Sequence, residues 1–485
     1  MLFNSFEFLL FFPIVTLIYF LLPHKFRWFH LLIASCVFYM AFIPVYILIL
    51  FLTIIVDYIA GIMIENAEGR RRKLFLAMSI VANVGILGFF KYYNFFIDNV
   101  NHVFLWTHIS ANIPFLKIIL PIGLSFHTFQ AMSYTIEVYR GNQRSERHFG
   151  IYALYVMFYP QLVAGPIERP QNMLHQFHEK HEFEYDEVVA GLRMMLWGVF
   201  KKAVIADRLA VFTDPVFNNP YAYSATVMVI ATVFFAFQIF CDFSGYSNIA
   251  LGAARVMGFK LMVNFNWPYS AKSISEFWRR WHISLSTWFS DYIYNPISVS
   301  LRDYGLLAVV IASLITFFIS GVWHGAAWHY IVWGGLHGVA IAYEVVTRKT
   351  RKKFFKKIPV WAGNIIGLTC TFSYVCFSYI FFRANNLRDA FYIVRRIPSA
   401  FAECAGLLKG HMPVLQMPIS SARVILCVLA IGILELVHII QNKKSLNIVL
   451  QNQPWYLRWG IYYFFVFMIL YMGVFQNRQF IYFQF

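Results

Sequence analysis

Charged residues are scarce in this sequence, at 13% of its 485 positions, whereas hydrophobic residues make up 60%. One soluble core could not enclose that much apolar surface. The chain also lacks an evident internal repeat, a low-complexity tract and a polar stretch long enough to form a soluble domain. Together these features predict a polytopic membrane protein of the all-α class.

Cysteine is also sparse. The sequence contains six cysteines, namely Cys36, Cys241, Cys370, Cys376, Cys404 and Cys427. Most lie in apolar segments without paired metal-ligand spacing, so we interpret them as buried small hydrophobic residues and expect neither a disulfide nor a metal site. A Walker motif and a Gly-rich nucleotide loop are also lacking, which argues against an ATP-driven pump.

Acidic residues are outnumbered by basic ones, and the formal net charge is +17. In a soluble protein this excess would suggest nucleic acid as a partner. Here the basic residues fall in short loops between apolar runs, so we interpret them as topology signals and contacts with anionic lipid. The first apolar run lacks a basic n-region and a clear cleavage site, so we expect it to be a retained span.

Apolar runs predict about 11 spanning helices. The clearest runs lie near residues 6–22, 29–43, 45–64, 75–96, 115–138, 306–321, 326–346, 361–382, 421–440 and 459–475. By the positive-inside rule, the basic clusters at 70–73, 140–147 and 347–357 are cytoplasmic. The N-terminus and the C-terminus are then predicted to lie on the outer side of the membrane.

The middle of the chain departs from this simple alternation. Pro, Gly and charged residues interrupt the apolar pattern in three segments, at 159–170, 191–212 and 240–252. We therefore expect re-entrant and interfacial helices there. Asp242 lies in the third segment. It has two possible interpretations, a member of a polar network between helices or a functional residue.

The stretch SGVWHGAAWHYIVWGGLHG, residues 320–338, places His324, His329 and His337 among tryptophans and glycines. A charge at membrane depth costs about 2.5 to 3.5 kcal/mol on insertion scales, so titratable groups there are functional candidates. The glycines predict a packed or interrupted helix beside a cavity. Imidazole can take a proton from an attacking hydroxyl and return it to a leaving thiol. The alternative for each histidine is a hydrogen-bonded packing role.

A second candidate segment, residues 273–296, is both aromatic and basic. One interpretation is a helix that anchors the protein at the membrane interface. The functional interpretation is that Arg279 and Arg280 attract an anionic donor, while His282 reaches into the core from the cytoplasmic side.

Six blocks in order resemble the membrane-bound O-acyltransferase family, specifically the bacterial branch that contains the alginate O-acetyltransferase. The blocks are residues 120–141, 164–170, 242–252, 264–294, 320–338 and 381–384. The resemblance extends over nearly the whole chain and implies one integral-membrane domain, 1–485, with helices around a central funnel. Within it we expect peripheral helices at about 1–110, a catalytic core at about 115–346 and C-terminal helices at about 361–485.

The resemblance also implies residue roles. His324 matches the essential histidine of the family, and His282 matches a second histidine near the donor side. Trp323, His337 and Asp242 match supporting or donor-binding positions, with structural support equally open for the last two. Relatives often have a Gly-rich turn after the Asp-Tyr-Ile-Tyr element, where this chain continues Asn-Pro-Ile.

The implied reaction is O-acetylation of an extracytoplasmic polysaccharide, such as alginate, peptidoglycan or another envelope glycan. Acetyl-CoA is the implied acyl donor, used as a substrate, and no bound cofactor is expected. An exported or membrane-anchored SGNH or esterase-like protein is the implied partner, and the polysaccharide is the final acceptor. The implied location is the bacterial cytoplasmic (inner) membrane, with lipid around the helices and no nucleic acid.

The last six residues, 480–485 (FIYFQF), look like the C-terminal hexapeptide of a small membrane peptide in the teichoic-acid D-alanylation system. This likeness makes Tyr482 a candidate acyl relay, with His324 activating its phenol. The alternative is that the aromatic residues anchor the chain end at the outer interface.

Three rival functions stay open at this point. D-alanyl transfer to teichoic acid is the nearest, because it belongs to the same family. A proton-coupled transporter would also place acidic residues such as Asp57, Asp242 and Glu435 at membrane depth. A catalytically dead scaffold is the third, and the presence of both His282 and His324 argues against it.

Overall fold

The computed structural model describes residues 1–118, 120–163, 165–408, 416–443, 446–475 and 480–481. In these ranges the chain is helical and contains no strand. It packs as two compact units, residues 1–195 with 246–263 and residues 196–245 with 264–485. The boundary falls inside two helices, α9 (Tyr185–Val199) and α11 (Ala225–Val256). The predicted all-α fold is confirmed.

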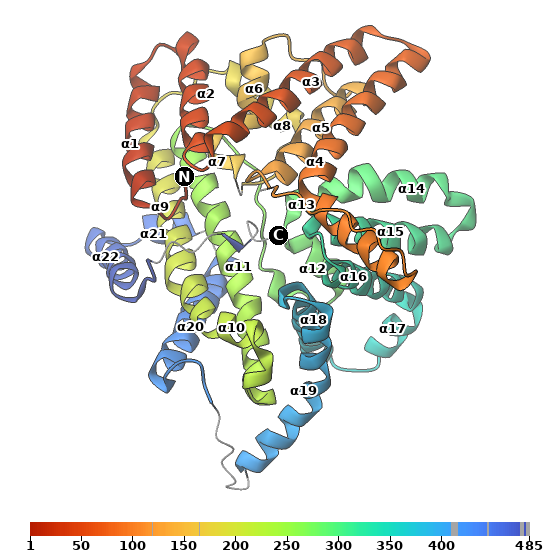
Figure 1. Cartoon of the computed structure of the whole chain (residues 1–485). Helices are drawn as coiled ribbons and strands as arrows, with labels where there is room; N and C mark the ends of the chain where they lie inside the picture. The colour runs from red at the N-terminus through yellow and green to blue at the C-terminus, as the bar shows by residue number, and fades with distance from the viewer. Residues whose placement is uncertain (119, 164, 409–415, 444–445, 476–479, 482–485) are drawn as a thin grey trace. The chain divides into compact units, whose positions relative to one another are not determined.

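The first unit is drawn mainly in red to yellow in Figure 1. Before α9 it contains α1 (Phe6–Leu21), α2 (His24–Met40), η1 (Pro44–Tyr46), α3 (Ile47–Asn66), α4 (Gly69–Trp106), α5 (Leu124–Arg140), α6 (Phe149–Met157), α7 (Tyr159–Leu162) and α8 (Pro170–His178). Helix α3 packs against both α4 and α5, and α2 packs against α6. Gly61 of α3 makes the close contact with α5 possible, because a Cβ atom there would lie 2.5 Å from the Tyr134 ring.

Two helices in this unit differ in extent from the apolar runs that predicted them. Helix α4 continues to Trp106, well past the predicted end near residue 96. Helix α5 begins only at Leu124, whereas the apolar run began near 115. Pro121 has no N–H to donate, and Gly123 adopts a left-handed conformation with φ of 79°, so residues 115–118 do not join the helix.

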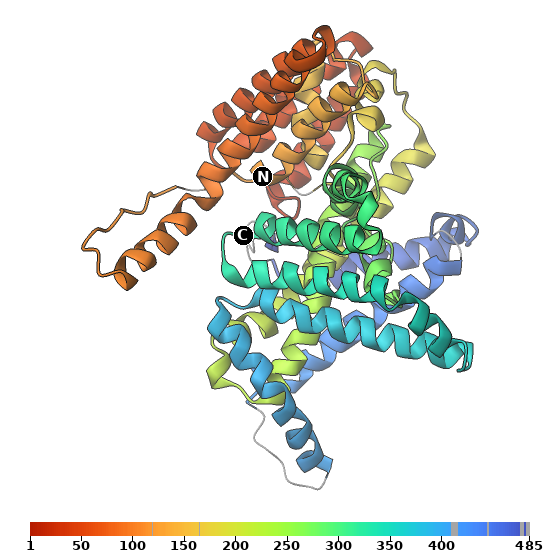
Figure 2. The ribbon, with the colours of Figure 1, turned by 90° about the vertical axis from the view of Figure 1, so that its right-hand side faces the viewer.

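The second unit contains the remaining elements. They are the π-helix η2 (Phe200–Ala206), α10 (Asp207–Asn218), η3 (Pro220–Ala222), η4 (Pro268–Ser270), α12 (Ile274–Arg280), α13 (Ile283–Phe289), the π-helix η5 (Ser290–Tyr294), α14 (Asn295–Ser300), η6 (Arg302–Tyr304), α15 (Leu306–His324), α16 (Trp328–Val346), α17 (Arg348–Phe355), α18 (Val360–Arg383), α19 (Leu387–Leu408), α20 (Ser421–Lys443), α21 (Leu446–Gln451) and α22 (Trp455–Met472). Helices α15 and α16 lie side by side, in green to teal in Figure 2, and α18 packs against α16.

Residues 240–252, where the sequence predicted a re-entrant or interfacial helix, contain no break in the helix. These residues lie inside α11, a continuous helix of 32 residues. Its polar side chains are compensated by lysines from η2: the Lys202 Nζ atom lies 2.6 Å from an Asp242 oxygen, and Lys201 Nζ donates to the Ser244 hydroxyl at 2.9 Å. The ion pair and the hydrogen bond offset much of the free-energy cost of burying these polar side chains, so the helix can stay continuous and buried.

The other two interrupted segments differ from each other. Residues 191–212 are helical throughout, passing from α9 through the π-helix η2 into α10. In 159–170, the four-residue helix α7 is followed by non-helical backbone at 165–169 before α8 begins at Pro170. The Asn-Pro departure from the family pattern lies where the π-helix η5 passes directly into α14, so the chain stays helical through Asn295 and Pro296.

Among the described residues, six helical segments are long and apolar enough to cross a membrane. They are Pro44–Asn66, Gly69–Trp106, Ala225–Val256, Leu306–His324, Val360–Arg383 and Ser421–Gln441. A shorter apolar helix occupies Phe6–Leu21. The chain is therefore a multi-pass membrane protein, and the number of about 11 spans stays a prediction.

Candidate active site

The candidate site is built on the hairpin of α15 and α16. Helix α15 ends at His324, and Gly325 follows in an extended conformation. A Cβ atom on Gly325 would lie 2.1 Å from the Tyr330 ring, and one on Gly334 would lie 2.9 Å from the Gly321 Cα atom. The glycines thus bring the two helix backbones into contact around a break in the helix, as the sequence predicted.

His324 is buried among aromatic rings. Its ring centroid lies 4.9 Å from that of Trp323, 4.6 Å from that of Trp333 and 5.6 Å from that of Phe382. The Nδ1 atom lies 2.6 Å from the main-chain oxygen of Ser320. A carbonyl oxygen only accepts hydrogen bonds, so this contact assigns the proton to Nδ1 and the lone pair to Nε2. The neutral imidazole therefore has the tautomer that a general base at Nε2 requires.

His282 occupies the junction of α12 and α13 in a left-handed conformation, with φ of 44° and ψ of 56°. This conformation is uncommon for a residue with a side chain, and such strain gathers at functional sites. Asn264 holds the junction: its main-chain oxygen accepts from the Ile283 N–H at 2.9 Å, and its Oδ1 atom accepts from the Ser284 hydroxyl at 2.7 Å. The His282 ring is fully buried and lies 4.5 Å from the Phe243 ring.

The two histidines singled out by the sequence belong to the same unit and lie within electrostatic range of each other. Both imidazoles are buried. They come from separate segments, the junction of α12 and α13 and the end of α15.

His337 has a different environment. Its Nδ1 atom accepts from the Trp278 indole N–H at 3.2 Å, and its Nε2 atom lies 3.0 Å from the Ser378 hydroxyl. That hydroxyl donates to the Val375 main-chain oxygen at 2.8 Å, so it accepts from His337 Nε2. Both ring nitrogens hold α12, α16 and α18 together, which is the geometry of a packing residue.

The two arginines of α12 are separated by the fold. Arg280 lies against Glu276, with its Nη2 atom 2.8 Å from Oε1, and also bonds Ser270. Arg279 has no hydrogen bond or ion pair among the described residues and is exposed. Its side chain lines a cavity of about 350 Å³. Arg279 is thus available to an anionic ligand, whereas Arg280 is engaged within the protein.

This cavity runs beside the α15–α16 hairpin. Its lining residues are Ser275, Trp278, Arg279, Leu285, Ser286, Phe289, Ser290, Tyr294, Ser313, Thr316, Phe317, Ser320, Ile341 and Val345. Val345 lies at the end of α16 that leads into the basic helix α17. Ser320 lies one helical turn from His324 and contacts it. The cavity therefore extends from the basic end of the hairpin to the level of the histidine.

Asp242 belongs to a buried ionic cluster, in line with the polar network that was one of its two expected roles, but the sequence pattern did not indicate its lysine partner. The Lys202 Nζ atom lies 2.6 Å from Asp242 Oδ1 and 2.8 Å from Asp207 Oδ1. The other Asp242 oxygen accepts the Ile481 main-chain N–H at 2.7 Å. Tyr482, the candidate relay, lies outside the described residues. Charged residues within an apolar helical stretch were the available signal for this cluster.

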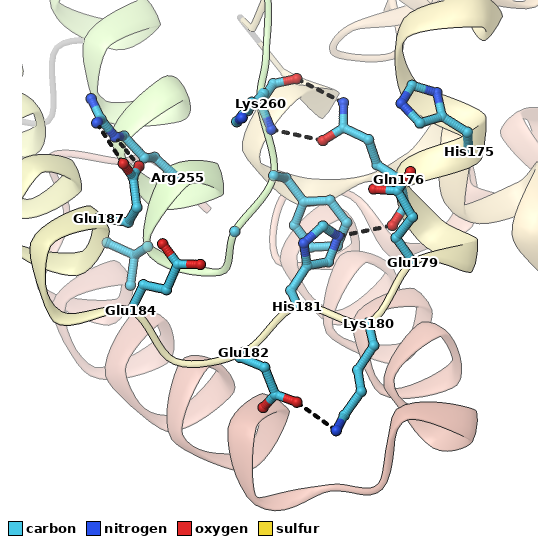
Figure 3. A pocket seen from close by; sticks show the side chains of 13 residues that line it. His175, Gln176, Glu179, Lys180, His181, Glu182, Glu184, Glu187, Arg255 and Lys260 are labelled. Carbon is cyan, nitrogen blue, oxygen red and sulfur yellow. Dashed lines mark hydrogen bonds and ion pairs between the residues drawn. The ribbon is translucent and has the colours of Figure 1, made fainter.

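A second pocket, of about 430 Å³, lies in the first unit and is drawn in Figure 3. Its rim is ionic, but much of its charge is paired internally: Arg255 lies 2.6 Å from Glu187, and Lys180 lies 2.5 Å from Glu182. The hydrogen bond from Arg255 lowers the pKa of the Glu187 carboxyl. We interpret this pocket as a solvated ionic surface. Across the described ranges, no group of three or more His, Cys, Asp or Glu side chains has a metal-binding arrangement.

Comparison with known proteins identifies the family. The model of the membrane-bound O-acyltransferase family matches residues 142–382. The chain is similar to the peptidoglycan O-acetyltransferase of Helicobacter pylori, at 34% identity over 393 residues, which cover 75% of this chain and 72% of the relative. It is similar to the probable alginate O-acetylase of Pseudomonas aeruginosa, at 38% identity over 403 residues, covering 80% and 73% of the two chains.

A relative with a different activity is less similar to the chain. The teichoic acid D-alanyltransferase of Bacillus subtilis is 29% identical over 297 residues, which cover 57% of this chain and 72% of the relative. The matched family region contains Asp242, His282, His324 and His337. The chain belongs to the membrane-bound O-acyltransferase family and is a multi-pass membrane O-acyltransferase.

Proposed function

We propose that the protein takes an acetyl group from a cytoplasmic thioester and passes it across the bacterial cytoplasmic (inner) membrane to an envelope polysaccharide. The observation that carries this proposal is the buried His324 imidazole, whose Nδ1 proton is held by the Ser320 carbonyl so that Nε2 is the basic atom. The similarity to enzymes that acetylate peptidoglycan and alginate supports acetyl as the acyl group and a polysaccharide as the acceptor.

Acetyl-CoA is the donor that suits the cavity beside Arg279. The volume of about 350 Å³ falls in the range of small-molecule sites. Arg279 offers a guanidinium for phosphate oxygens at one end, and Trp278 and Phe317 offer apolar walls for an uncharged arm. Ser320 brings the inner end of that arm to His324.

The reaction follows from the tautomer of His324. Nε2 takes the proton of an attacking hydroxyl as the hydroxyl oxygen bonds to the thioester carbonyl carbon. The C–S bond then breaks, and the imidazolium returns the proton to the leaving thiolate. We assign His282 to the donor side of this exchange, where its buried imidazole lies within electrostatic range of His324.

We further propose Tyr482 as the first acceptor. Tyr482 follows Ile481, which is buried and bonded to Asp242 in the unit that contains His324. The acyl-tyrosine would then pass its group to an SGNH or esterase-like partner on the outer side, where both termini lie in this proposal. That partner would complete transfer to the polysaccharide.

The test is base-labile acetate on envelope glycans from cells that carry the native protein or His324→Ala, with membrane levels matched by blot. His102→Ala is the matched control, because His102 is exposed on α4. Loss of acetate only in His324→Ala supports the proposal. Unchanged acetate in His324→Ala overturns it, and D-alanine esters measured in the same extracts then test the related D-alanyl transfer.

A further inference from the structure

The chain after α22 is bound to the stretch that begins with η2. The Arg208 guanidinium donates to the main-chain oxygen of Met472, with Nε at 3.1 Å. The Val474 N–H donates to the main-chain oxygen of Ala203 at 3.1 Å. Two main-chain groups of the segment that leaves α22 are therefore fixed to η2 and the start of α10.

The third attachment is the hydrogen bond from the Ile481 N–H to Asp242, at 2.7 Å. Asp242 is 3% exposed, and a buried carboxylate is costly unless a positive charge compensates for it. Lys202, which is 1% exposed, supplies that charge at 2.6 Å. A hydrogen bond to an ionised carboxylate is stronger than one to a neutral group, so Lys202 strengthens the attachment of Ile481 through Asp242.

The local backbone is adapted to bring Lys202 and Asp242 together. Lys202 lies in a π-helical stretch, a wide helical turn that is often found at functional sites. Gly245 faces it from α11, and a Cβ atom there would lie 2.9 Å from the Gly198 oxygen and 3.1 Å from the Lys202 nitrogen. The absent side chain at Gly245 lets the two helices approach closely enough for the ion pair.

The attached segment lies beside the candidate active site. Phe480 is fully buried, and its ring centroid lies 5.4 Å from that of Phe243. The Phe243 ring lies in turn 4.5 Å from the His282 ring. The Phe243 ring therefore contacts both Phe480 and His282.

We infer that Lys202 and Asp242 are positioning residues for the reaction, because they seat the C-terminal segment, residues 480–481, beside His282. The inference rests on the proposed function, because it makes this segment a participant in acyl transfer. The attachment of residues 480–481 to Asp242 can itself be tested without any acyl substrate. Lys202 and Asp242 act through the segment and not on the reacting atoms.

The attachment of the segment is measured by how fast a cysteine at position 481 reacts with a maleimide. Ile481→Cys keeps the N–H that Asp242 accepts, and the buried thiol should react slowly with a maleimide in membranes. Cys370 and Cys404, the exposed cysteines of the described chain, are first replaced by serine. Lys202→Met should raise the labelling rate about tenfold or more, because it weakens a charge-assisted hydrogen bond. Lys202→Arg should restore slow labelling.

Lys201→Met is the matched control. Lys201 is the adjacent residue of the same π-helix and is also buried, but its Nζ atom donates to a hydroxyl at 2.9 Å. This substitution should leave the labelling of the Ile481→Cys thiol slow. Because removing Lys202 can destabilise the fold, Asp242→Asn provides a second variant: the Lys202–Asp207 ion pair at 2.8 Å stays intact while the anionic acceptor is lost.

Acetate transfer is measured on the same variants with Ile481 restored. Faster labelling together with a fall in acetate of about tenfold, in both Lys202→Met and Asp242→Asn, supports the inference. Slow labelling in both variants overturns it, as does equal labelling in Lys201→Met and Lys202→Met, or native acetate levels despite fast labelling. Failure of the proposed function has a different signature, namely native acetate levels in His324→Ala.

Discussion

The Nδ1 atom of His324 lies 2.6 Å from the main-chain oxygen of Ser320, one turn earlier in α15, whereas the Ser320 hydroxyl lies 3.5 Å away. The backbone, which no substitution at Ser320 removes, therefore sets the tautomer of the histidine. We expect Ser320→Ala to keep acyl transfer within about threefold of native and His324→Gln to lower it about a hundred- to ten-thousandfold, because glutamine cannot serve as the base. Initial rates in proteoliposomes with labelled acyl donor measure both. Comparable losses in the two variants would contradict the backbone assignment.

The hydrogen bonds of His337 predict that replacing this residue lowers the stability of the fold and leaves the rate of acyl transfer unchanged. His337→Gln removes a geometry in which both ring nitrogens bridge helices, and we expect it to lower stability by about 1 to 3 kcal/mol. Thermal unfolding in detergent measures this change, and the rate per folded molecule should stay near native. A native unfolding temperature combined with an inactive enzyme would show that His337 takes part in the reaction.

The arginines of α12 should separate into two phenotypes. Arg279→Ala should raise the KM for the acyl donor about tenfold, because it removes a charged contact with the donor's phosphates. Arg280→Ala should instead lower the unfolding temperature, because Glu276 loses its ion-pair partner. Kinetics at two salt concentrations test the first effect, which should shrink at high salt. If Arg280→Ala alone raises the KM, the donor assignment is wrong.

Neighbouring glycines of α16 provide a test of the hairpin. A Cβ atom on Gly334 would lie 2.3 Å from the Phe317 main-chain oxygen, whereas one on Gly335 would meet nothing within 4 Å. We expect Gly334→Ala to destabilise the protein by ~1–3 kcal/mol and to impair transfer, and Gly335→Ala to be tolerated. Membrane level, unfolding temperature and transfer rate are measured for both. Equal tolerance of both would mean that α15 and α16 are not packed backbone to backbone.

Tyr482 is tested by removing only its hydroxyl. If the phenol is the first acceptor, Tyr482→Phe should abolish surface acetate while membrane level and unfolding temperature stay native. The retained ring controls for aromatic anchoring at the interface. Full surface acetylation in this variant would exclude the relay and leave direct transfer to an external acceptor.

The sequence was sufficient to predict helices, membrane residence and the family, because apolar runs and local motifs carry those features. At residues 240–252 the polar pattern predicted a re-entrant or interfacial helix, whereas the segment lies inside one continuous helix. The compensating lysine lies forty residues earlier in the chain, and no local pattern connects the two. Similarly, Arg279 and Arg280 are adjacent and alike in sequence, and only the fold shows that one of them is already paired.

His282 and His337 illustrate the same limit. Both are buried histidines in aromatic surroundings, and their residue type is equally suited to catalysis and to packing. The surroundings of the two residues differ in the hydrogen bonds of His337 and in the backbone angles of His282. Neither property can be read from residue identity.

The left-handed backbone at His282 sets strain and packing against each other at one position. Glycine would adopt a φ of 44° without the steric penalty that a side chain incurs, which is about 1 to 2 kcal/mol. Glycine would also leave the fully buried volume of the imidazole empty, and cavities left by large buried side chains cost about 2 to 5 kcal/mol. The packing of the ring against its neighbours therefore outweighs the strain of the backbone that carries it.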